Sequence, residues 1–292
     1  MVLTRSFVRA KRPCTDGYRW FVRQFEEGGN YQELLDTMVA AGRAGDACWL
    51  LQQFGPTAEL RVVDAIDADA VVFAGTLEVR GSVEVDGRIH VGRSLRVGGG
   101  VRVSGDLIVG EDLRVAGNVR ADGRIDVAGD LRAGWGVESA GDLRCAGKLR
   151  SGWDLRCGGR LRLGSSAFVG LDLHSEEELH CTGSLHVGGD LTAAANLRVD
   201  QGIVAGGSVR GALHLEAGWG IKAGGLISAN CAVRAGESLY AGEGIRAGDG
   251  YGVFAGLGVP VDAWETCARV SAPQKPAGLM SGWWAGAPGK GG

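Results

Sequence analysis

An aliphatic residue recurs at every sixth position over more than half of this chain. The series begins at Val71 and runs through 30 consecutive hexads to residue 250, and its first position is Ile, Leu or Val in 29 of them. Only Ala167 departs from the series, and no insertion shifts its phase. A six-residue period matches no helical face, whereas apolar first and third positions are typical of a short strand. Positions four to six are rich in glycine and polar residues, so the pattern predicts a strand and a corner in every hexad, which is a β-solenoid.

The number of hexads in one coil can be tested by comparing every eighteenth residue. At the fourth position of one face this column is glycine in eight of ten coils, whereas the equivalent column of the next face has only Gly158 and Gly248. A corner that needs glycine keeps it in coil after coil. We therefore expect a mainly β fold: a single-stranded parallel β-helix of triangular section, with about ten coils of 18 residues.

A column of alternating charges gives independent support for this period. The sixth position of the third face carries, coil after coil, Arg88, Asp106, Arg124, Asp142, Arg160 and Glu178. Stacked coils would place these side chains about 4.8 Å apart. Because opposite charges in cross-strand contact are stabilising, the column predicts a ladder of ion pairs along the prism.

Four regions are expected along the chain. Residues 1–15 form a basic, flexible N-terminus, 16–56 a small α-helical cap, 57–258 the β-solenoid, and 259–292 a C-terminal capping segment with a flexible tail. Apolar residues at amphipathic spacing predict three short helices in the cap, with Asn30 and Asp46 as helix caps. We expect this bundle to sit on the first coil and its aromatic residues to form its core.

The segment after residue 250 no longer follows the hexad. We expect a closing strand from its first apolar residues, prolines that prevent regular continuation, and tryptophans that fold over the last coil. These residues are, in the same order, Tyr251, Val253, Phe254 and Leu257; Pro260, Pro273 and Pro276; and Trp264, Trp283 and Trp284.

Composition excludes several classes of protein. Glycine accounts for 52 residues and proline for 6, yet 45% of the chain is hydrophobic, which is typical of neither disorder nor collagen. The net charge of −3 makes nucleic acid a weaker partner than protein. No run of about 18 apolar residues and no apolar secretory segment occurs, so we expect a cytoplasmic protein. Seven cysteines without a CxxC pair indicate reduced thiols rather than a disulfide framework.

The chain offers little that predicts catalysis. His174, His180 and His186 fall in consecutive hexads and are expected on three different faces, so we expect no metal site there. The cysteines at inward third positions are expected to pack as small hydrophobic residues; they are Cys145, Cys157 and Cys181. No P-loop, dinucleotide fingerprint or nucleophile elbow is found. We therefore expect no enzyme activity, no cofactor and no small-molecule substrate.

Six outward residues are candidates for binding a partner. Arg96, Arg114, Arg132 and Arg150 fall in one second-position column, and Trp135 and Trp153 lie one coil apart at a fifth position, where glycine is common. Arg and Trp are enriched at interface hot spots. The pattern predicts a docking patch for an acidic partner, and the alternative is a solvated face on which two tryptophans shield a corner.

Residues 71–250 resemble the core of bactofilins, the polymer-forming bacterial cytoskeletal proteins, in units such as VRVSGD, LRVAGN, IDVAGD and LRCAGK. The resemblance implies a right-handed triangular coil, end-to-end filaments formed without nucleotide, and weak membrane association through the short basic N-terminus. Two features depart from that family, since a helical cap precedes the solenoid and an aromatic segment follows it. Capped ends argue against filaments.

Three functions follow from these patterns. The favoured one is a rigid interaction module without enzyme activity, of which an inhibitor or immunity protein for a bacterial toxin is one concrete version. The first alternative is a bactofilin-like polymer, in which the partner is the protein itself. The second is an enzyme similar to hexapeptide-repeat acyltransferases, with His90 or His214 in a pocket between subunits. Against it, the second position here is mostly Arg or Glu rather than glycine, and no long loop interrupts the repeat.

Overall fold

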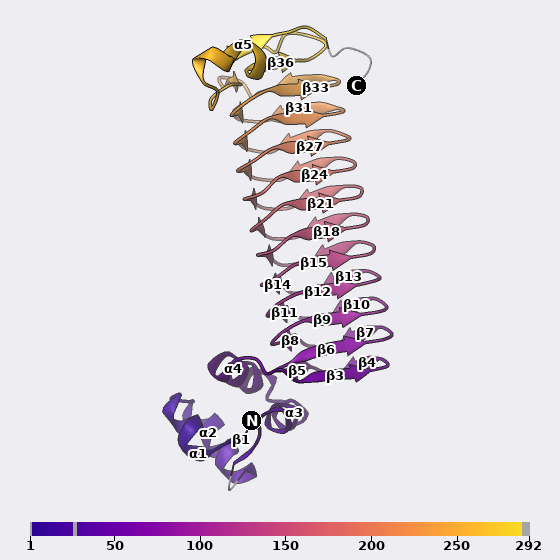
Figure 1. Ribbon diagram of the computed structural model, residues 1–292, viewed down its shortest axis with the longest axis vertical. Helices are drawn as coiled ribbons and strands as arrows, with labels where there is room; N and C mark the ends of the chain where they lie inside the picture. The colour runs from indigo at the N-terminus through magenta and orange to yellow at the C-terminus, as the bar shows by residue number, and fades with distance from the viewer. Residues whose placement is uncertain (1, 26–27, 288–292) are drawn as a thin grey trace.

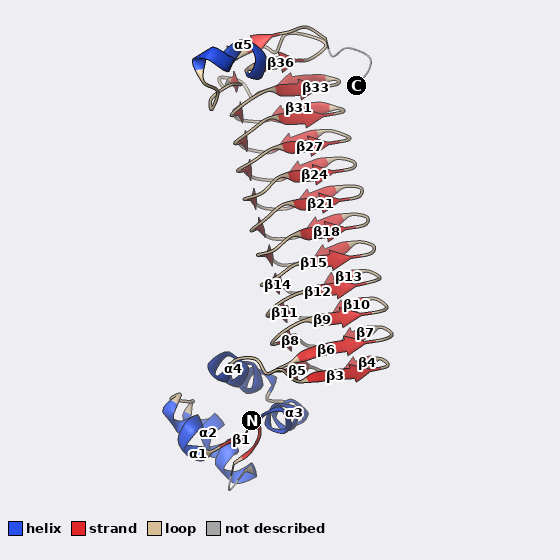
Figure 2. Cartoon of the chain, viewed as in Figure 1, coloured by secondary structure: helices blue, strands red, loops and turns tan. Residues whose placement is uncertain are grey.

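The computed structural model describes residues 2–25 and 28–287. Its main body is one long parallel β-solenoid, seen as a straight stack of coils in Figure 1. Helices occur only at the two ends of this stack (Figure 2). The strands form three parallel sheets of 11, 12 and 13 strands, which amounts to about 12 turns.

Each regular turn contributes one strand to each sheet. The 13-stranded sheet contains β3 (Leu60–Val63), β6 (Thr76–Val79), β9 (Leu95–Val97), β12 (Leu113–Val115), β15 (Leu131–Ala133), β18 (Leu149–Ser151), β21 (Ala167–Val169), β24 (Leu185–Val187), β27 (Ile203–Ala205), β30 (Ile221–Ala223), β33 (Leu239–Ala241), β36 (Arg269–Ser271) and β38 (Trp283–Trp284). The 11-stranded sheet contains β4 (Ile66–Ala68), β7 (Val83–Val85), β10 (Val101–Val103), β13 (Val119–Ala121), β16 (Val137–Ser139), β19 (Leu155–Cys157), β22 (Leu173–Ser175), β25 (Leu191–Ala193), β28 (Val209–Gly211), β31 (Leu226–Ala229) and β34 (Gly244–Arg246). The 12-stranded sheet contains β5 (Val71–Phe73), β8 (Ile89–Val91), β11 (Leu107–Val109), β14 (Ile125–Val127), β17 (Leu143–Cys145), β20 (Leu161–Leu163), β23 (Leu179–Cys181), β26 (Leu197–Val199), β29 (Leu215–Ala217), β32 (Val233–Ala235), β35 (Val253–Phe254) and β37 (Leu279–Ser281).

The register of the regular turns confirms the 18-residue period. Leu113 pairs with Leu131 and Leu131 with Leu149, and the same spacing holds along all three sheets of the regular region. First and third positions point inward and form one continuous apolar core from Phe73 to Ala272. Ala167, the exception in the aliphatic series, is fully buried like its neighbours. The predicted alternation of inward and outward residues is therefore confirmed.

The glycine column lies at the corner that follows the 13-stranded sheet, as expected, but the physical reason differs. None of these glycines has a φ in the left-handed region. Instead, a Cβ on Gly152 would lie 2.0 Å from the carbonyl oxygen of Gly134 in the preceding turn, and one on Gly224 would lie 2.0 Å from that of Gly206. At these turns a side chain has no room, because the carbonyl oxygen of the preceding turn lies too close.

Sixth-position side chains join consecutive turns at the corners. The carboxylate of Asp142 accepts a hydrogen bond from the Arg160 amide at 2.9 Å, and Asp106 accepts one from the Arg124 amide at 3.2 Å. The predicted charge ladder forms in these two steps, with Nε–Oδ2 distances of 3.8 and 3.6 Å. It does not extend to Glu178, because Arg160 pairs with Glu177 instead, at 3.5 Å.

The prediction of about ten coils was too low because the phase of the repeat shifts at both ends. In the first turn β3 pairs with β6 at a shorter spacing than in the regular turns, since Arg61 lies opposite Leu77. The spacing between β4 and β7 is also shortened, since Ile66 lies opposite Val83. Counting in sixes from Val71 therefore misses this turn.

The C-terminal end also continues the solenoid, with longer connections. β35 pairs with β32, β36 with β33, β37 with β35 and β38 with β36. The connection between β35 and β36 holds a short 3-10 helix (Val261–Ala263) and α5 (Trp264–Cys267). Trp283 and Trp284 therefore form a strand rather than a cover over the last coil, and Leu257 lies exposed outside the predicted closing strand. Of the expected flexible tail, residues 288–292 lie outside the described residues.

The N-terminal residues form a small cap of four helices, α1 (Arg5–Ala10), α2 (Thr15–Gln24), α3 (Tyr31–Ala40) and α4 (Ala44–Phe54). Residues 2–15 are not a flexible tail as expected. β1 (Val2–Leu3) pairs with β2 (Gly29–Asn30), and Leu3 and Val8 are buried in the core of the cap. The sequence did not predict this structure, because most residues of the segment are polar or basic and only a few apolar residues between them pack into the core.

One of the two predicted helix caps is confirmed. Asn30 caps α3 as predicted, because its side chain accepts a hydrogen bond from the Gln32 amide at 3.0 Å. Asp46 does not cap α4, which begins two residues earlier; it lies in the first turn and accepts a hydrogen bond from Arg43 Nε at 2.6 Å. Arg43 also pairs with Asp16 at 2.8 Å, so one guanidinium joins α2 to α4.

Candidate functional site

Four outward arginines form a continuous column on the 13-stranded sheet. Arg96, Arg114, Arg132 and Arg150 occupy the middle positions of β9, β12, β15 and β18, and each lies in register with the next. The structure therefore brings the four predicted residues together. Neighbouring strands lie about 4.8 Å apart, so the column spans about 14 Å. Like charges directly opposite each other in a sheet are destabilising, so folding alone gives no reason for this run.

Carboxylates compensate two of these charges. Arg96 pairs with Glu78 at 2.6 Å and Arg114 with Asp112 at 3.0 Å. The guanidinium of Arg150 lies over the neutral ring of Phe168, 5.4 Å from its centroid. Among the described residues Arg132 and Arg150 have no ion-pair partner, so the C-terminal half of the column holds its uncompensated positive charge.

The two predicted tryptophans stack on each other at the corner that follows this sheet. The rings of Trp135 and Trp153 are 5.4 Å apart between centroids and nearly parallel, with an interplanar angle of 8°. They stay 49% and 53% exposed, so the pair leaves much of its apolar surface in water. Leu171 follows one turn later in the same column and is also exposed. Leu171 is not among the residues predicted from the sequence, although the same 18-residue step from Trp153 leads to it.

Polar groups inside the corner fix the backbone that carries the tryptophans. The buried hydroxyl of Ser151 donates to the carbonyl oxygen of Trp135 at 2.8 Å and can donate to that of Asp154 at 3.0 Å. The side chain of Asn118 accepts a hydrogen bond from the Gly136 amide at 3.0 Å. Because these groups hold the main chain, the indole rings project outward from a rigid support.

A shallow hollow of about 860 Å³ runs beside the first three arginines. Its lining includes Arg96, Arg114 and Arg132, the acidic Glu78 that pairs with Arg96, and the small corner residues Ala116 and Gly134. Gly134 immediately precedes the first tryptophan of the pair, so the hollow reaches the turn that carries that residue. Basic side chains and exposed aromatic rings therefore occur next to each other along the prism.

The arginine column continues in aromatic and apolar residues toward the C-terminus. Phe168 stacks on His186 with centroids 4.9 Å apart, and Val204, Lys222 and Tyr240 follow in the same register. No second position on this sheet from Arg96 to Tyr240 is acidic. The other two sheets mix signs, as in the ion pair between Arg120 and Glu138 on the 11-stranded sheet.

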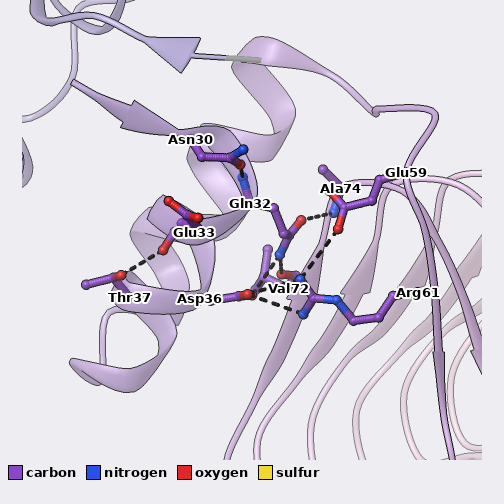
Figure 3. Close-up of polar contacts among 9 residues, drawn as sticks. All are labelled: Asn30, Gln32, Glu33, Asp36, Thr37, Glu59, Arg61, Val72 and Ala74. Atoms are coloured by element: carbon purple, nitrogen blue, oxygen red, sulfur yellow. Dashed lines mark hydrogen bonds and ion pairs between the residues drawn. The ribbon is translucent and has the colours of Figure 1, made fainter.

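The helical cap closes only part of the N-terminal end of the prism. Figure 3 shows Gln32 of α3 beside the outer edge of β5, where its amide group takes the place of a neighbouring strand. Its Nε2 donates to the Val72 carbonyl at 3.1 Å, and its Oε1 accepts from the Ala74 amide at 2.9 Å. Gln32 is 4% exposed, so these backbone groups are satisfied without water. The cap thus seals the edge of the 12-stranded sheet.

At this end of the prism the helical cap does not cover the outer edges of the other two sheets in the same way. Arg61 of β3 lies over the Phe73 ring, 4.7 Å from its centroid, and donates two hydrogen bonds of 3.2 Å to Asp36 of α3 (Figure 3). On their outer edges, β3 and β4 have no neighbouring strand in the described chain, because each is the first strand of its sheet. The segments that follow these two strands carry acidic residues, Asp64 and Asp69, which disfavour edge-to-edge pairing.

The cap also covers part of the outer face of the 12-stranded sheet. Val72 of β5 is buried in the core of the cap, and His90 of β8, its partner in register, is 8% exposed. Burial, together with the nearby guanidinium groups of Arg124 and Arg88, lowers the pKa of His90 below its ordinary value. His90 is therefore a neutral packing residue rather than an accessible base.

The three histidines of consecutive hexads lie apart from one another, and two of the inward cysteines are buried. His174, His180 and His186 lie on the 11-, 12- and 13-stranded sheets respectively, so they face three directions as predicted. Cys145 and Cys181 are buried in the core, where burial raises their pKa values to about 12 and about 11. In residues 2–25 and 28–287 no group of three His, Cys, Asp or Glu side chains is arranged to hold a metal ion.

The comparisons with known proteins concern mainly the cap. Residues 1–55 match the family model described as the YdhT N-terminal domain. Neither the curated proteins nor the solved structures give a match. The structure therefore confirms the β-solenoid that the resemblance to bactofilins implied, but the comparisons give no support for membership of that family. No helix in the described part of the chain combines the length and apolar character needed to cross a membrane.

Proposed function

We propose that this protein is an interaction module without enzyme activity, in which the β-solenoid presents the arginine column and the tryptophan pair to an acidic protein partner. The observation that carries the proposal is the unbroken run from Arg96 to Arg150, in register on four consecutive strands. Like charges in register are destabilising, and an anionic surface that covers the column would relieve this cost. An inhibitor or immunity protein that binds a bacterial toxin is the concrete form of this function.

The tryptophan pair supports the same proposal. Large, exposed, stacked aromatic rings beside arginines are the residue types that dominate binding energy at protein interfaces. A rigid support lowers the entropy lost on binding, because the corner backbone around Trp135 and Trp153 is already held by hydrogen bonds. The partner we expect is therefore folded, acidic and locally apolar, and it binds in the cytoplasm.

The test compares matched charge reversals on two faces. Arg114→Glu with Arg132→Glu reverses the centre of the column, and Arg144→Glu with Arg162→Glu reverses two exposed neighbours in register on the 12-stranded sheet. Tagged protein is used to capture partners from a lysate of the source cells, with quantitative mass spectrometry. We expect one protein to be lost with the first double variant and kept with the second. Equal capture by both variants would refute the proposal.

Self-assembly is a second candidate, since β3 and β4 leave two sheet edges without a neighbouring strand at the N-terminal end of the described chain. The acidic residues around these strands argue for a weak or reversible contact. Light scattering across protein concentration, with negative-stain microscopy of the same samples, separates the two candidates. Filaments would favour the polymer, whereas a discrete particle leaves partner binding as the function.

A further inference from the structure

Two columns of exposed side chains run side by side along the prism at the corner that follows the 13-stranded sheet. One is the second-position arginine column, and the other is the fifth-position ridge of Trp135, Trp153 and Leu171. Between them lies the fourth-position strip, in which Gly134 and Gly152 carry no side chain. The two columns are three residues apart along each turn, which is at most about 10 Å, so an α-helix about 10–12 Å across can contact both at once.

We propose that an acidic amphipathic α-helix of the partner protein lies on this strip, parallel to the axis of the prism, and contacts both columns. This inference rests on the proposed function and specifies the element by which the partner binds. One turn of α-helix rises about 5.4 Å, and one turn of the solenoid rises about 4.8 Å. Four carboxylates on one helical stripe therefore span about 16 Å beside an arginine column of about 14 Å. The flexible side chains on both sides absorb this difference.

An extended segment fits the face less well. Its alternate side chains lie about 6.6 Å apart, so carboxylates and arginines would fall out of step after one pair. Its backbone amides and carbonyls would also lie against a sheet face, where the strands of the solenoid have already used their own hydrogen-bonding groups. A helix satisfies its backbone internally and presents only side chains. The regular face therefore favours a helix over a strand.

The ridge defines the second stripe of that helix. Trp135 and Trp153 are about half exposed and Leu171 is exposed beside them, so an apolar side chain one helical stripe away from the carboxylates would cover them. Arg132, which has no ion-pair partner in the described chain, lies on the same turn as Trp135. We expect carboxylate contacts at Arg114, Arg132 and Arg150 and the main apolar contact at the two indoles.

The experiment uses the full-length protein and synthetic alanine-based peptides of about 20 residues, which as helices are about 30 Å long and so exceed the arginine column at both ends. The first peptide places Glu at positions i, i+4, i+7 and i+11, with Leu on the adjacent stripe. The second has the same composition with the Glu residues distributed around the helix, and the third keeps the first pattern but contains two central prolines that prevent a helix. Affinity is measured by calorimetry and by indole fluorescence at low and at physiological salt.

The expected result is that the first peptide binds about tenfold more tightly than the other two, because each exposed ion pair adds a few-fold and the apolar stripe adds more. Arg114→Ala with Arg132→Ala should remove this preference, and Arg144→Ala with Arg162→Ala should leave it intact. Trp135→Ala with Trp153→Ala should weaken the first peptide, while Trp219→Ala, at another exposed corner, should not.

Two outcomes would overturn the inference. If the proline-containing peptide binds as tightly as the first, an acidic partner without a helix suffices, so the inference fails and the proposed function stands. If none of the peptides binds while a single-stranded oligonucleotide does, with the same dependence on Arg114 and Arg132, the face binds phosphates and both the inference and the proposed function fail.

Discussion

Replacing Gly224 by alanine tests whether close approach between turns sets the geometry of the corner. In this column a Cβ at Gly224 would lie 2.0 Å from the carbonyl oxygen of Gly206 and 3.0 Å from its carbon. The turns at this corner are joined by hydrogen bonds from the Gly224 amide to Ala205 at 3.0 Å and from the Gly225 amide to Gly207 at 2.9 Å. A methyl group at Gly224 can enter only if the backbone at this corner shifts. Ala116 occupies the same column and keeps the equivalent bonds, from its own amide to Val97 at 3.0 Å and from the Gly117 amide to Gly99 at 2.9 Å, so the cost lies in the shift rather than in lost hydrogen bonds.

The size of the effect follows from the overfilled site, because overfilling a packed site costs about 1–3 kcal/mol. Gly202 provides the matched control, because its φ is not left-handed and a Cβ there would meet its nearest atom at 3.5 Å. Alanine at Gly202 should be neutral or stabilising by about 0.4–1 kcal/mol through the unfolded chain. We therefore expect Gly224→Ala to be less stable than Gly202→Ala by about 1–4 kcal/mol.

Urea unfolding followed by far-ultraviolet circular dichroism measures this difference. The slope of each transition shows whether the two variants unfold over the same cooperative unit, which matters for a repeat protein. If both variants have the same midpoint, the turns at this corner separate without cost, and the explanation of the glycine column is wrong.

Three further predictions address the core, the cap junction and the effect of pH. Leu149→Asp places a charge in the fully buried core and should abolish cooperative thermal unfolding, so an unchanged melting curve would contradict the assigned register. Gln32→Leu leaves two buried backbone groups of β5 unpaired and should destabilise the cap by about 1–3 kcal/mol for each group, as measured by hydrogen exchange, whereas exposed Gln52→Leu should change little. The pKa of His90 is lowered in the folded state, so the unfolded chain takes up a proton first as pH falls below about 6.5, and stability is lost from there down to the folded pKa. His90→Leu should flatten this pH dependence of the unfolding midpoint, and an equal slope in both proteins would show that other groups cause it.

The regular part of the fold was predictable because every inward position requires the same kind of side chain, a small or aliphatic one, whatever its place along the solenoid. An aliphatic residue at every sixth position and glycine in one corner column define strand length, inward face and period without reference to distant residues. The period of 18 directly predicts that Arg96 lies in register with Arg114 and that Trp135 lies next to Trp153. The interface candidates are therefore as predictable as the register.

The ends were not predictable because tertiary contacts decide them. The place of Arg61 opposite Leu77 depends on a turn that is shorter than the regular period, and no local signal marks that shortening. Gln32 reads as an ordinary helical residue, yet its role depends on a strand edge 40 residues away. The strand at Trp283 and Trp284 pairs across long proline-containing connections, which a regular period cannot reveal.

The constant step between equivalent residues of successive turns also governs how this protein can change its length over evolutionary time. Gain or loss of one whole turn moves the two ends by about 4.8 Å and leaves every side chain on its original face. Loss of a single hexad would keep all inward positions aliphatic, so the chain would still fold. However, every residue beyond the deletion would rotate to the next face. A deletion between Arg96 and Arg150 would therefore split the arginine column between two sides of the prism. Insertion or deletion of a hexad thus preserves the apolar core, and with it the fold. Only insertion or deletion of a whole turn also preserves the arrangement of side chains on the surface.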